Sequence, residues 1–398
     1  MNTYLKKIKN IKNIYGKFNN SELDSVLNVL DSNNNTDYNK KLEDLFCKTF
    51  KVKYAISCNS GTSGLHSALA ALNLKKDDEV IVPGLTVVMD AYAALHLGAT
   101  PIFADVDEET YLITAKTIKK KITKKTKAII VVSLEGLPVD IDPIMKIAKE
   151  KNIFVVEDNA QDMLGKYKGR ISGTTGDISV WSFENKKHLS GATEGGIIST
   201  NNKVLAERIR KFAGIGYKNM TASGGRTSLS ISMVQDPNYE RFDTVGLNYR
   251  MPQIVAAVCY SQLSSARKIV QRRIKVANYF SQAIKKSKIL IEQKKPKNTK
   301  HSHYTFSARL ISSKKNKWKD IYNIYKSKTG HGFYGACVCP HLEPAIINHM
   351  KKVGCYNCKK TLSKKCYCTK KGFLPVAEKI QKQIMQFKTN YRNLDEAK

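Results

Sequence analysis

The sequence lacks a long apolar run. No segment of the 398 residues approaches the roughly 18 apolar residues that a membrane-spanning helix needs. Residues 1–17 are basic, but they contain no continuous apolar core of the length found in secretion signals. The nine cysteines are an odd number, which favours free thiols in a reducing compartment. These features predict a cytoplasmic protein with no membrane partner.

Acidic residues are scarce relative to basic ones. The chain has 34 Asp and Glu against 67 Lys and Arg, which gives a formal net charge of +33. Such a surplus can attract nucleic acid or anionic membrane. The lysines, however, are spread along the whole chain and do not gather in one arm with interleaved aromatic residues. We therefore expect a lysine-rich surface and no nucleic-acid partner.

Internal repeats of the solenoid type are absent, and 42% of the residues are hydrophobic, which is enough for a sizeable core. Between about residues 54 and 200, short β-rich runs alternate with helical stretches, and several runs are apolar almost throughout. This alternation predicts an α/β fold in which helices sandwich a mainly parallel mixed sheet. The expected strands are Glu79–Pro83, Pro101–Val106, Ala128–Leu134, Phe154–Glu157, Ile178–Phe183 and Gly196–Thr200.

The length suits two domains. Residues 20–55 have the apolar spacing of a helical lead-in, residues 214–245 are rich in Gly, Ser, Thr and Asn and resemble a long loop, and residues 252–286 have the pattern of one long helix. We predict a large α/β domain over 1–245 and a smaller C-terminal α+β domain over 246–398.

Two stretches in the first half of the chain carry groups suited to binding a ligand. The stretch 59–64, Asn-Ser-Gly-Thr-Ser-Gly, enters a predicted helix, where small residues leave N–H groups free to bind a phosphate. By itself it also fits an ordinary capped helix start. The run 154–161 ends a predicted strand with Glu157 and Asp158, at the strand end where ligands of α/β sheets bind. A carboxylate there can hold a cationic ring nitrogen, or it can simply face solvent.

Two further stretches follow. In the run 180–189, a predicted strand delivers Ser182 and, five residues later, Lys187, before a Gly-Gly turn. The hydroxyl can donate to a phosphate and the amine can form an imine, although a basic pair on the surface is the alternative. The stretch 246–251 precedes the predicted long helix, and Asn248 within it either caps that helix or reaches an active site, including that of a neighbouring subunit.

The order and spacing of the four stretches resemble the DegT/StrS family of fold-type I pyridoxal-phosphate (PLP) enzymes, the sugar aminotransferases that act on nucleotide-linked keto sugars. The resemblance covers about residues 20–270, including 78–83 and 98–107, and is sparser beyond residue 300. It implies a fold-type I aminotransferase fold with PLP as cofactor.

The resemblance assigns roles residue by residue. Lys187 aligns with the lysine that forms the Schiff base with PLP and then serves as the base, and Asp158 aligns with the acid that pairs with the pyridine nitrogen. Gln161 aligns with the residue near the ring hydroxyl. The residues aligned with the phosphate site are Gly61, Thr62, Ser63, Ser182 and, from the partner subunit, Asn248. The last match implies a homodimer with shared active sites.

The chain departs from the family pattern in two places. Val87 stands where the family often has an aromatic residue that stacks on the ring, and one extra residue separates Lys187 from the Glu-Gly-Gly at 194–196. Dehydratases among the relatives replace the lysine by histidine, whereas here the histidine follows the lysine, at His188. The retained lysine favours transamination, and we interpret His188 as a packing or substrate-loop residue.

The expected function is transfer of an amino group from L-glutamate to a nucleotide-diphosphate keto sugar, in amino-sugar or surface-glycan biosynthesis. A PLP-dependent dehydratase or epimerising enzyme is one alternative, and retention of Lys187 counts against it. A non-catalytic, basic nucleic-acid-binding protein is the other, and the survival of nearly all cofactor-holding residues counts against that.

A group of cysteines near the C-terminus has two interpretations. The first two have the spacing of zinc ligands, but the seven-residue gap and the Cys-x-Cys pair that follow are not a standard zinc arrangement. We therefore favour free thiols in an inserted loop and assign no metal to Cys355, Cys358, Cys366 and Cys368. Cys337 and Cys339 lie beside His341 without a nearby fourth ligand, and we assign no metal there either.

Overall fold

A seven-stranded sheet lies at the centre of the structure, a computed structural model that describes residues 18–31, 35–224, 230–311, 317–353, 369–391, 394–395 and 397. The strand order is β1-β9-β8-β5-β4-β2-β3, and only β9 runs against its neighbours. The strands are β1 (Tyr54–Cys58), β2 (Glu79–Pro83), β3 (Thr100–Ala104), β4 (Thr126–Val132), β5 (Phe154–Asp158), β8 (Ile178–Ser182) and β9 (Gly196–Thr200). The predicted fold class and all six predicted strands are confirmed, while β1 was not expected.

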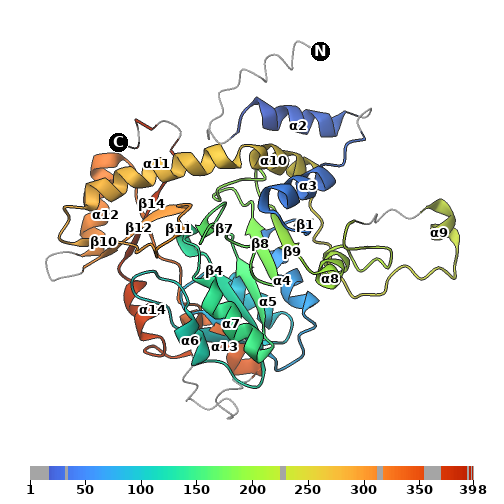
Figure 1. Cartoon of the computed structure of the whole chain (residues 1–398), viewed down its shortest axis with the longest axis horizontal. Coiled ribbons are helices and arrows are strands. Elements are labelled where there is room, and N and C mark those ends of the chain that lie inside the picture. Colours follow the sequence, from blue (N-terminus) through green and yellow to red (C-terminus); the bar gives the residue numbers. More distant parts are fainter. Residues whose placement is uncertain are drawn as a thin grey trace.

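Helices cover both faces of this sheet (Figure 1). The helices that follow its strands are α4 (Gly61–Ala71), α5 (Met89–Leu95), α6 (Ala115–Lys119), α7 (Ile141–Lys151) and α8 (Lys203–Ala213). Because side chains of a strand alternate between faces, neighbouring residues of β9 enter two different cores: Ile198 packs with the helices after the strands, and Ile197 packs with the N-terminal helices.

The predicted helical lead-in forms α2 (Asn20–Leu30) and α3 (Tyr38–Phe50), which pack against α10 (Gln253–Ser264). The helix expected over 252–286 is two helices, because α11 (Ala266–Ile284) begins after a non-helical residue, Ser265. The hydroxyl of Ser264 donates to the Tyr260 carbonyl at 3.0 Å, a bond back along the helix that bends helices.

A second, antiparallel sheet packs against α11 and α12 (Trp318–Thr329). Its order is β10-β12-β14-β13, formed by Leu290–Glu292, Thr305–Leu310, Ile384–Lys388 and Tyr334–Gly335. A third sheet joins β11 (Thr299–Lys300) to β6 (Lys166–Tyr167) and β7 (Arg170–Ile171), so segments from both halves of the chain share it.

Later segments return to the large sheet. The helices α13 (Pro344–Val353) and α14 (Pro375–Ile380), with the 3-10 turn η2 (Pro340–Leu342), contribute Ile346, Met350 and Ala377 to the core of that sheet. The division of the chain at 245/246 stays a prediction. The short helix α9 (Ile231–Gln235) lies within the predicted loop 214–245 and projects from the body (Figure 1).

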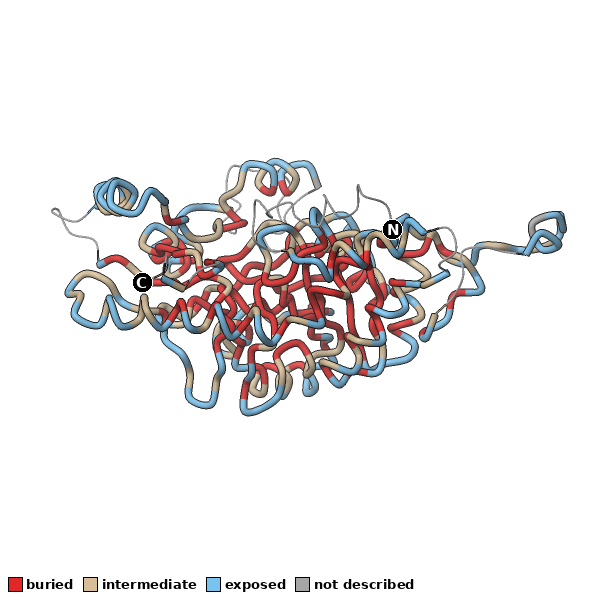
Figure 2. Tube along the Cα trace, turned by 90° about the horizontal axis from the view of Figure 1, so that it is seen from above, coloured by how far each residue is buried: buried red, intermediate tan, exposed pale blue. Residues whose placement is uncertain are grey.

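Burial concentrates in the middle of the molecule, and the segment around α9 is largely exposed (Figure 2). No helix in the described ranges is both long and apolar enough to cross a membrane.

The core between α3 and the sheet generates a stability prediction. The ring of Phe46 is fully buried, stacks on Phe50 at 4.1 Å between centroids and meets Trp181 edge-on at 4.8 Å. We expect Phe46→Ala to lower the free energy of unfolding by about 3–5 kcal/mol, because it removes buried apolar area and leaves a cavity. Urea unfolding followed by circular dichroism measures this. Leu30→Ala, at a side chain 64% exposed, is the control; equal losses for both variants would contradict the assignment of this core.

Candidate active site

Lys187 lies in the loop that follows β8, and its backbone is fixed from two sides. Its N–H donates to the Glu184 carbonyl at 2.9 Å, and its own carbonyl accepts from Nη2 of Arg273 at 3.2 Å. The Nζ atom lies 5.1 Å from the centre of the Tyr304 ring. The loop returns to β9 through hydrogen bonds from Phe183 N–H to the Gly195 carbonyl and from Gly191 N–H to the Phe183 carbonyl, both at 2.8 Å.

Asp158 ends β5, the neighbour of β8, and is only 1% exposed. Its Oδ1 accepts a hydrogen bond from Ala160 N–H at 2.8 Å. Burial raises the pKa of the Asp158 carboxyl, whereas the Ala160 N–H and the charge of Lys187 lower it. The amine of Lys187 therefore lies near enough for its charge to act on this carboxyl. A shared cofactor pocket for the two groups stays a prediction.

A second carboxyl, Asp90 in the first turn of α5, lies beside Asp158 and was not anticipated from the sequence. It is fully buried, and the hydroxyl of Thr86 donates to its Oδ2 at 2.7 Å. Burial, followed by the neighbouring Asp158 carboxylate, raises the pKa of Asp90 well above its usual value. Because two carboxylates cannot both ionise in such a site, Asp90 holds the proton and Asp158 carries the charge.

The other end of the pocket offers donors for an anion. Helix α4 begins at Gly61, and the backbone N–H groups of its first turn have no partner within the helix. A Cβ at Gly61 would lie 2.8 Å from Cβ of Ser182, so the helix start and the end of β8 approach closely only because residue 61 is glycine. The hydroxyl of Ser63 is engaged in the helix cap, donating to Asn59 Oδ1 at 2.6 Å. The N–H groups of Gly61 and Thr62 and the Ser182 hydroxyl are therefore the donors suited to a phosphate.

Gln161 links the pocket to a buried carboxyl that the sequence analysis missed. Its Oε1 accepts from the backbone N–H of Glu135 at 2.8 Å, and its Nε2 lies 3.9 Å from Sγ of Cys337. Glu135 is 1% exposed and adopts a left-handed φ of 61°, and the Thr305 hydroxyl donates to its carboxylate. Burial raises the pKa of Glu135 to about 7, against the lowering effects of Thr305, Lys187 and Ser307. A single glutamate in a short turn has no sequence signal that marks it as a site residue.

Asn248 is not brought into the pocket of its own chain. Its side chain is exposed, and its Oδ1 accepts from Nε of Arg250 at 3.0 Å. The adjacent Tyr249 carbonyl does accept from Asn59 N–H at 2.8 Å, which places the segment near the start of α4. The role of Asn248 as a residue given to a partner subunit stays a prediction.

His188 is 3% exposed, and its Nε2 lies 3.1 Å from the Ser302 carbonyl. His341 pairs with Glu378, with Nε2 3.0 Å from Oε1. In the described part of the chain, no three Cys, His, Asp or Glu side chains come together as a metal site. The cysteines at 355, 358, 366 and 368 lie outside the described residues.

Comparison with known proteins now places the chain. The sequence model of the DegT/DnrJ/EryC1/StrS aminotransferase family matches residues 17–336. The chain belongs to this family. It is 37% identical over 270 residues to the GDP-perosamine synthase of Escherichia coli O157:H7, a match that spans 68% of this chain and 69% of that protein.

Solved structures agree on the fold. The aminotransferase of Psychrobacter cryohalolentis superposes with a TM-score of 0.82 at 28% identity, over 96% of this chain and 94% of that one. The E. coli GDP-4-keto-6-deoxy-D-mannose-3-dehydratase with bound hydrated PLP superposes with a TM-score of 0.79 at 24% identity, over 96% and 95%, and shares the fold.

The cofactor is pyridoxal phosphate, and the residues present fit it. The close approach of Gly61 to Ser182 places the N–H groups at the start of α4 beside the Ser182 hydroxyl, so that these donors can act on one phosphate. The buried Asp158 carboxylate suits a protonated pyridine nitrogen, and the amine of Lys187 is close enough to act on that carboxylate.

The carboxyl pair predicts unequal effects of two isosteric changes. Asp158→Asn removes the negative charge, so we expect at least a hundredfold loss of amino transfer. Asp90→Asn replaces a protonated carboxyl by another donor, so we expect a loss below tenfold. Steady-state kcat and the PLP affinity of each purified variant measure both effects. If Asp90→Asn lost more activity than Asp158→Asn, the charge would have to be assigned to Asp90 and the proton to Asp158.

Glu135 predicts a pH-dependent difference in stability. Its folded pKa of about 7 lies above the unfolded value of 4.5, so the stability that its proton contributes is complete below pH 4.5 and is lost as pH rises toward 7. Glu135→Gln has no such proton to lose. We therefore expect cofactor-free wild type to lose up to about 3 kcal/mol relative to the variant across this window.

Urea unfolding of both proteins at pH 5 and pH 8 measures the difference. Glu150→Gln, at an exposed carboxyl on α7, is the matched control. A wild type that gains stability over Glu135→Gln as pH rises would show that Glu135 is ionised in the folded protein at pH 5.

Proposed function

We propose that the enzyme transfers an amino group from L-glutamate to the keto carbon of a nucleotide-diphosphate-linked sugar, in a route to amino sugars of surface glycans. The proposal is supported by the electrostatic effect of Lys187 on the buried Asp158 carboxyl, in a chain that is 37% identical to a GDP-perosamine synthase. With no membrane-spanning helix found among the described residues, the proposed location is the cytoplasm.

The residues of the chain have separate tasks in this reaction. When bound, PLP supplies an electron sink for the carbon that loses its proton. The Asp158 carboxylate keeps the pyridine nitrogen protonated, because the buried negative charge gains a cationic partner there. The amine of Lys187 would take the proton from the donor carbon and return it to the carbon on the other side of the imine nitrogen, two atoms away. The N–H groups at the start of α4 and the Ser182 hydroxyl hold the phosphate and so fix the orientation of the ring.

The position of His188 supports transfer over dehydration. A dehydratase shares the fold, so the fold alone does not separate the two reactions. In this chain the amine stands at Lys187, near Asp158, whereas the His188 ring lies against the Ser302 carbonyl and lines a different cavity. An amine at position 187, where dehydratases of the family have a histidine, favours amino transfer.

We also propose that two copies of the chain share their active sites. The segment that carries Asn248 exposes large apolar side chains, with Phe242 52%, Val245 96% and Leu247 41% exposed. Contiguous exposed apolar residues mark interaction surfaces. A partner subunit that covers them would bring Asn248 to the phosphate end of the neighbouring pocket.

Substitution of the two adjacent lysines tests the proposed reaction. Lys187→Ala removes both the cofactor attachment and the base, so we expect amino transfer to fall below detection and borohydride to fix no PLP to the chain. Lys186→Ala, at the exposed neighbouring lysine, should keep both properties within threefold. Mass spectrometry of products from UDP-, GDP- and dTDP-keto sugars with glutamate measures the transfer. The proposal would be wrong if Lys187→Ala transferred the amino group at the rate of the parent enzyme. It would also be wrong if no substrate gave an amino sugar.

A further inference from the structure

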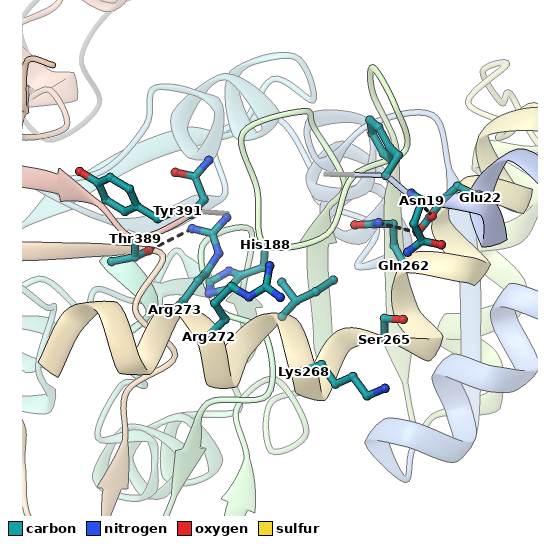
Figure 3. Close-up of a pocket in the computed structure, with 13 residues that line it drawn as sticks. Asn19, Glu22, His188, Gln262, Ser265, Lys268, Arg272, Arg273, Thr389 and Tyr391 are labelled. Atoms are coloured by element: carbon teal, nitrogen blue, oxygen red, sulfur yellow. Dashed lines mark hydrogen bonds between the residues drawn. The ribbon is translucent and has the colours of Figure 1, made fainter. Parts of the chain in front are cut away.

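A cavity of about 410 Å³ lies between the start of α2, one face of α11 and the chain just after β14 (Figure 3). The α11 residues that line it are Lys268, Ile269, Arg272 and Arg273, and Ser265, just before the helix, also lines it. Their spacing places them on a single face of the helix. A helix face that packs against protein is normally apolar. Three cations on this face therefore indicate that it faces a negatively charged ligand.

Among the described residues, Arg273 is a buried cation without a counter-ion. Its side chain is 4% exposed and donates only to neutral oxygens: Nη1 to the Tyr304 carbonyl at 2.9 Å and to the Thr389 hydroxyl at 3.1 Å, and Nη2 to the Lys187 carbonyl at 3.2 Å. Burial lowers the pKa of Arg273 to about 10. No carboxylate pairs with it among the residues that the structure describes. A buried charge without a counter-ion lowers the stability of the folded protein. An anion in the adjoining cavity would offset this loss.

Lys268 and Arg272 add two exposed charges at the mouth of the same cavity. They are four residues apart on α11, a spacing at which like charges repel, and neither forms an ion pair within the described ranges. The acid in the lining, Glu22, lies at the other end of the cavity (Figure 3). It accepts from Asn19 N–H at 2.8 Å and from Nε2 of Gln262 at 2.7 Å, so it is already bound.

We propose that this cavity binds an anion of the diphosphate class. Two guanidinium groups and one ammonium group match the oxygens of a diphosphate, and the volume lies in the range of small-ligand sites. The cavity is separate from the cofactor pocket, because its lining contains neither Asp158 nor Ser182. The cavity adjoins the Lys187 loop in two ways. Arg273, which lines the cavity, donates to the Lys187 carbonyl, and His188 of the same loop forms part of the cavity wall. A bound anion therefore holds the loop that presents Lys187.

The diphosphate has two possible sources, which the test separates. One is the diphosphate of a nucleotide-linked sugar, and this source rests on the function proposed above. The other is a free inorganic anion, which acts on the Lys187 loop without being part of the substrate. The binding measurement uses no amino transfer, so the anion site and the proposed function can fail independently.

Calorimetric titration of the PLP-loaded chain with inorganic pyrophosphate tests the site. Loading with PLP fills the phosphate end of the cofactor pocket, so that pyrophosphate cannot bind there. We expect Lys268→Gln combined with Arg272→Gln to weaken pyrophosphate binding at least tenfold. The matched control combines Arg267→Gln and Lys275→Gln, two exposed cations of α11 that do not line the cavity, and should change binding less than twofold. Arg273 is left unchanged because it anchors the Lys187 loop.

The results show whether the anion site exists and whether its ligand is a nucleotide diphosphate or a free inorganic anion. Saturable pyrophosphate binding that is lost only in the cavity variant supports the proposal. If GDP competes with pyrophosphate and is weakened by the same variant, the source is the nucleotide. If pyrophosphate binds and GDP does not, the source is a free anion. Absence of saturable pyrophosphate binding, or equal weakening by both double variants, overturns the proposal, because surface charge alone would then account for the binding.

Discussion

The proposed active site depends on a negative charge held inside the protein at the end of β5. The Asp158 carboxylate has almost no contact with water, and such a charge is unfavourable unless positive groups face it. The chain supplies two of these, the Ala160 N–H and the Lys187 amine, and it keeps the adjacent Asp90 protonated. A cationic pyridine nitrogen bound to this carboxylate would satisfy the site more fully than the protein does alone. The affinity for the cofactor and the position of the lysine loop thus have one physical origin.

The same region joins the two sheets. Glu135 and Gly136 follow β4 of the large sheet, and their carbonyls accept from Tyr304 N–H and Ser302 N–H, both at 2.9 Å, just before β12 of the small sheet. A Cβ at Gly136 would lie 2.6 Å from Oγ of Ser302, so the turn can dock this closely only without a side chain. The polar wall of the pocket is therefore also the contact that fixes the small sheet relative to the large one.

The sequence predicted those parts of the protein whose signals are local. Apolar runs marked six strands, and the spacing of Ser182 and Lys187 identified the loop after β8. The strand β1 was missed because Tyr54–Cys58 begins at the end of the stretch 20–55 that was predicted to be a helical lead-in. The break at Ser265 escaped because the apolar spacing continues through it without Pro or Gly. Asp90 resembles an ordinary acid in the first turn of a helix. The return of α13 and α14 to the large sheet was unpredictable because periodicity shows that a helix has an apolar face, not which distant core that face joins.

One guanidinium has a consequence for the order in which the protein is completed. Arg273 connects segments that are far apart along the chain, the lysine loop at residue 187, the start of β12 and the residue after β14. The last of these, Thr389, follows β14 and is synthesised long after the lysine loop. Until it is in place, Arg273 lacks one of its three acceptors, and the loop is held less firmly. The growing chain therefore carries Lys187 and Asp158 well before the contact that completes the anchoring of the lysine loop can form.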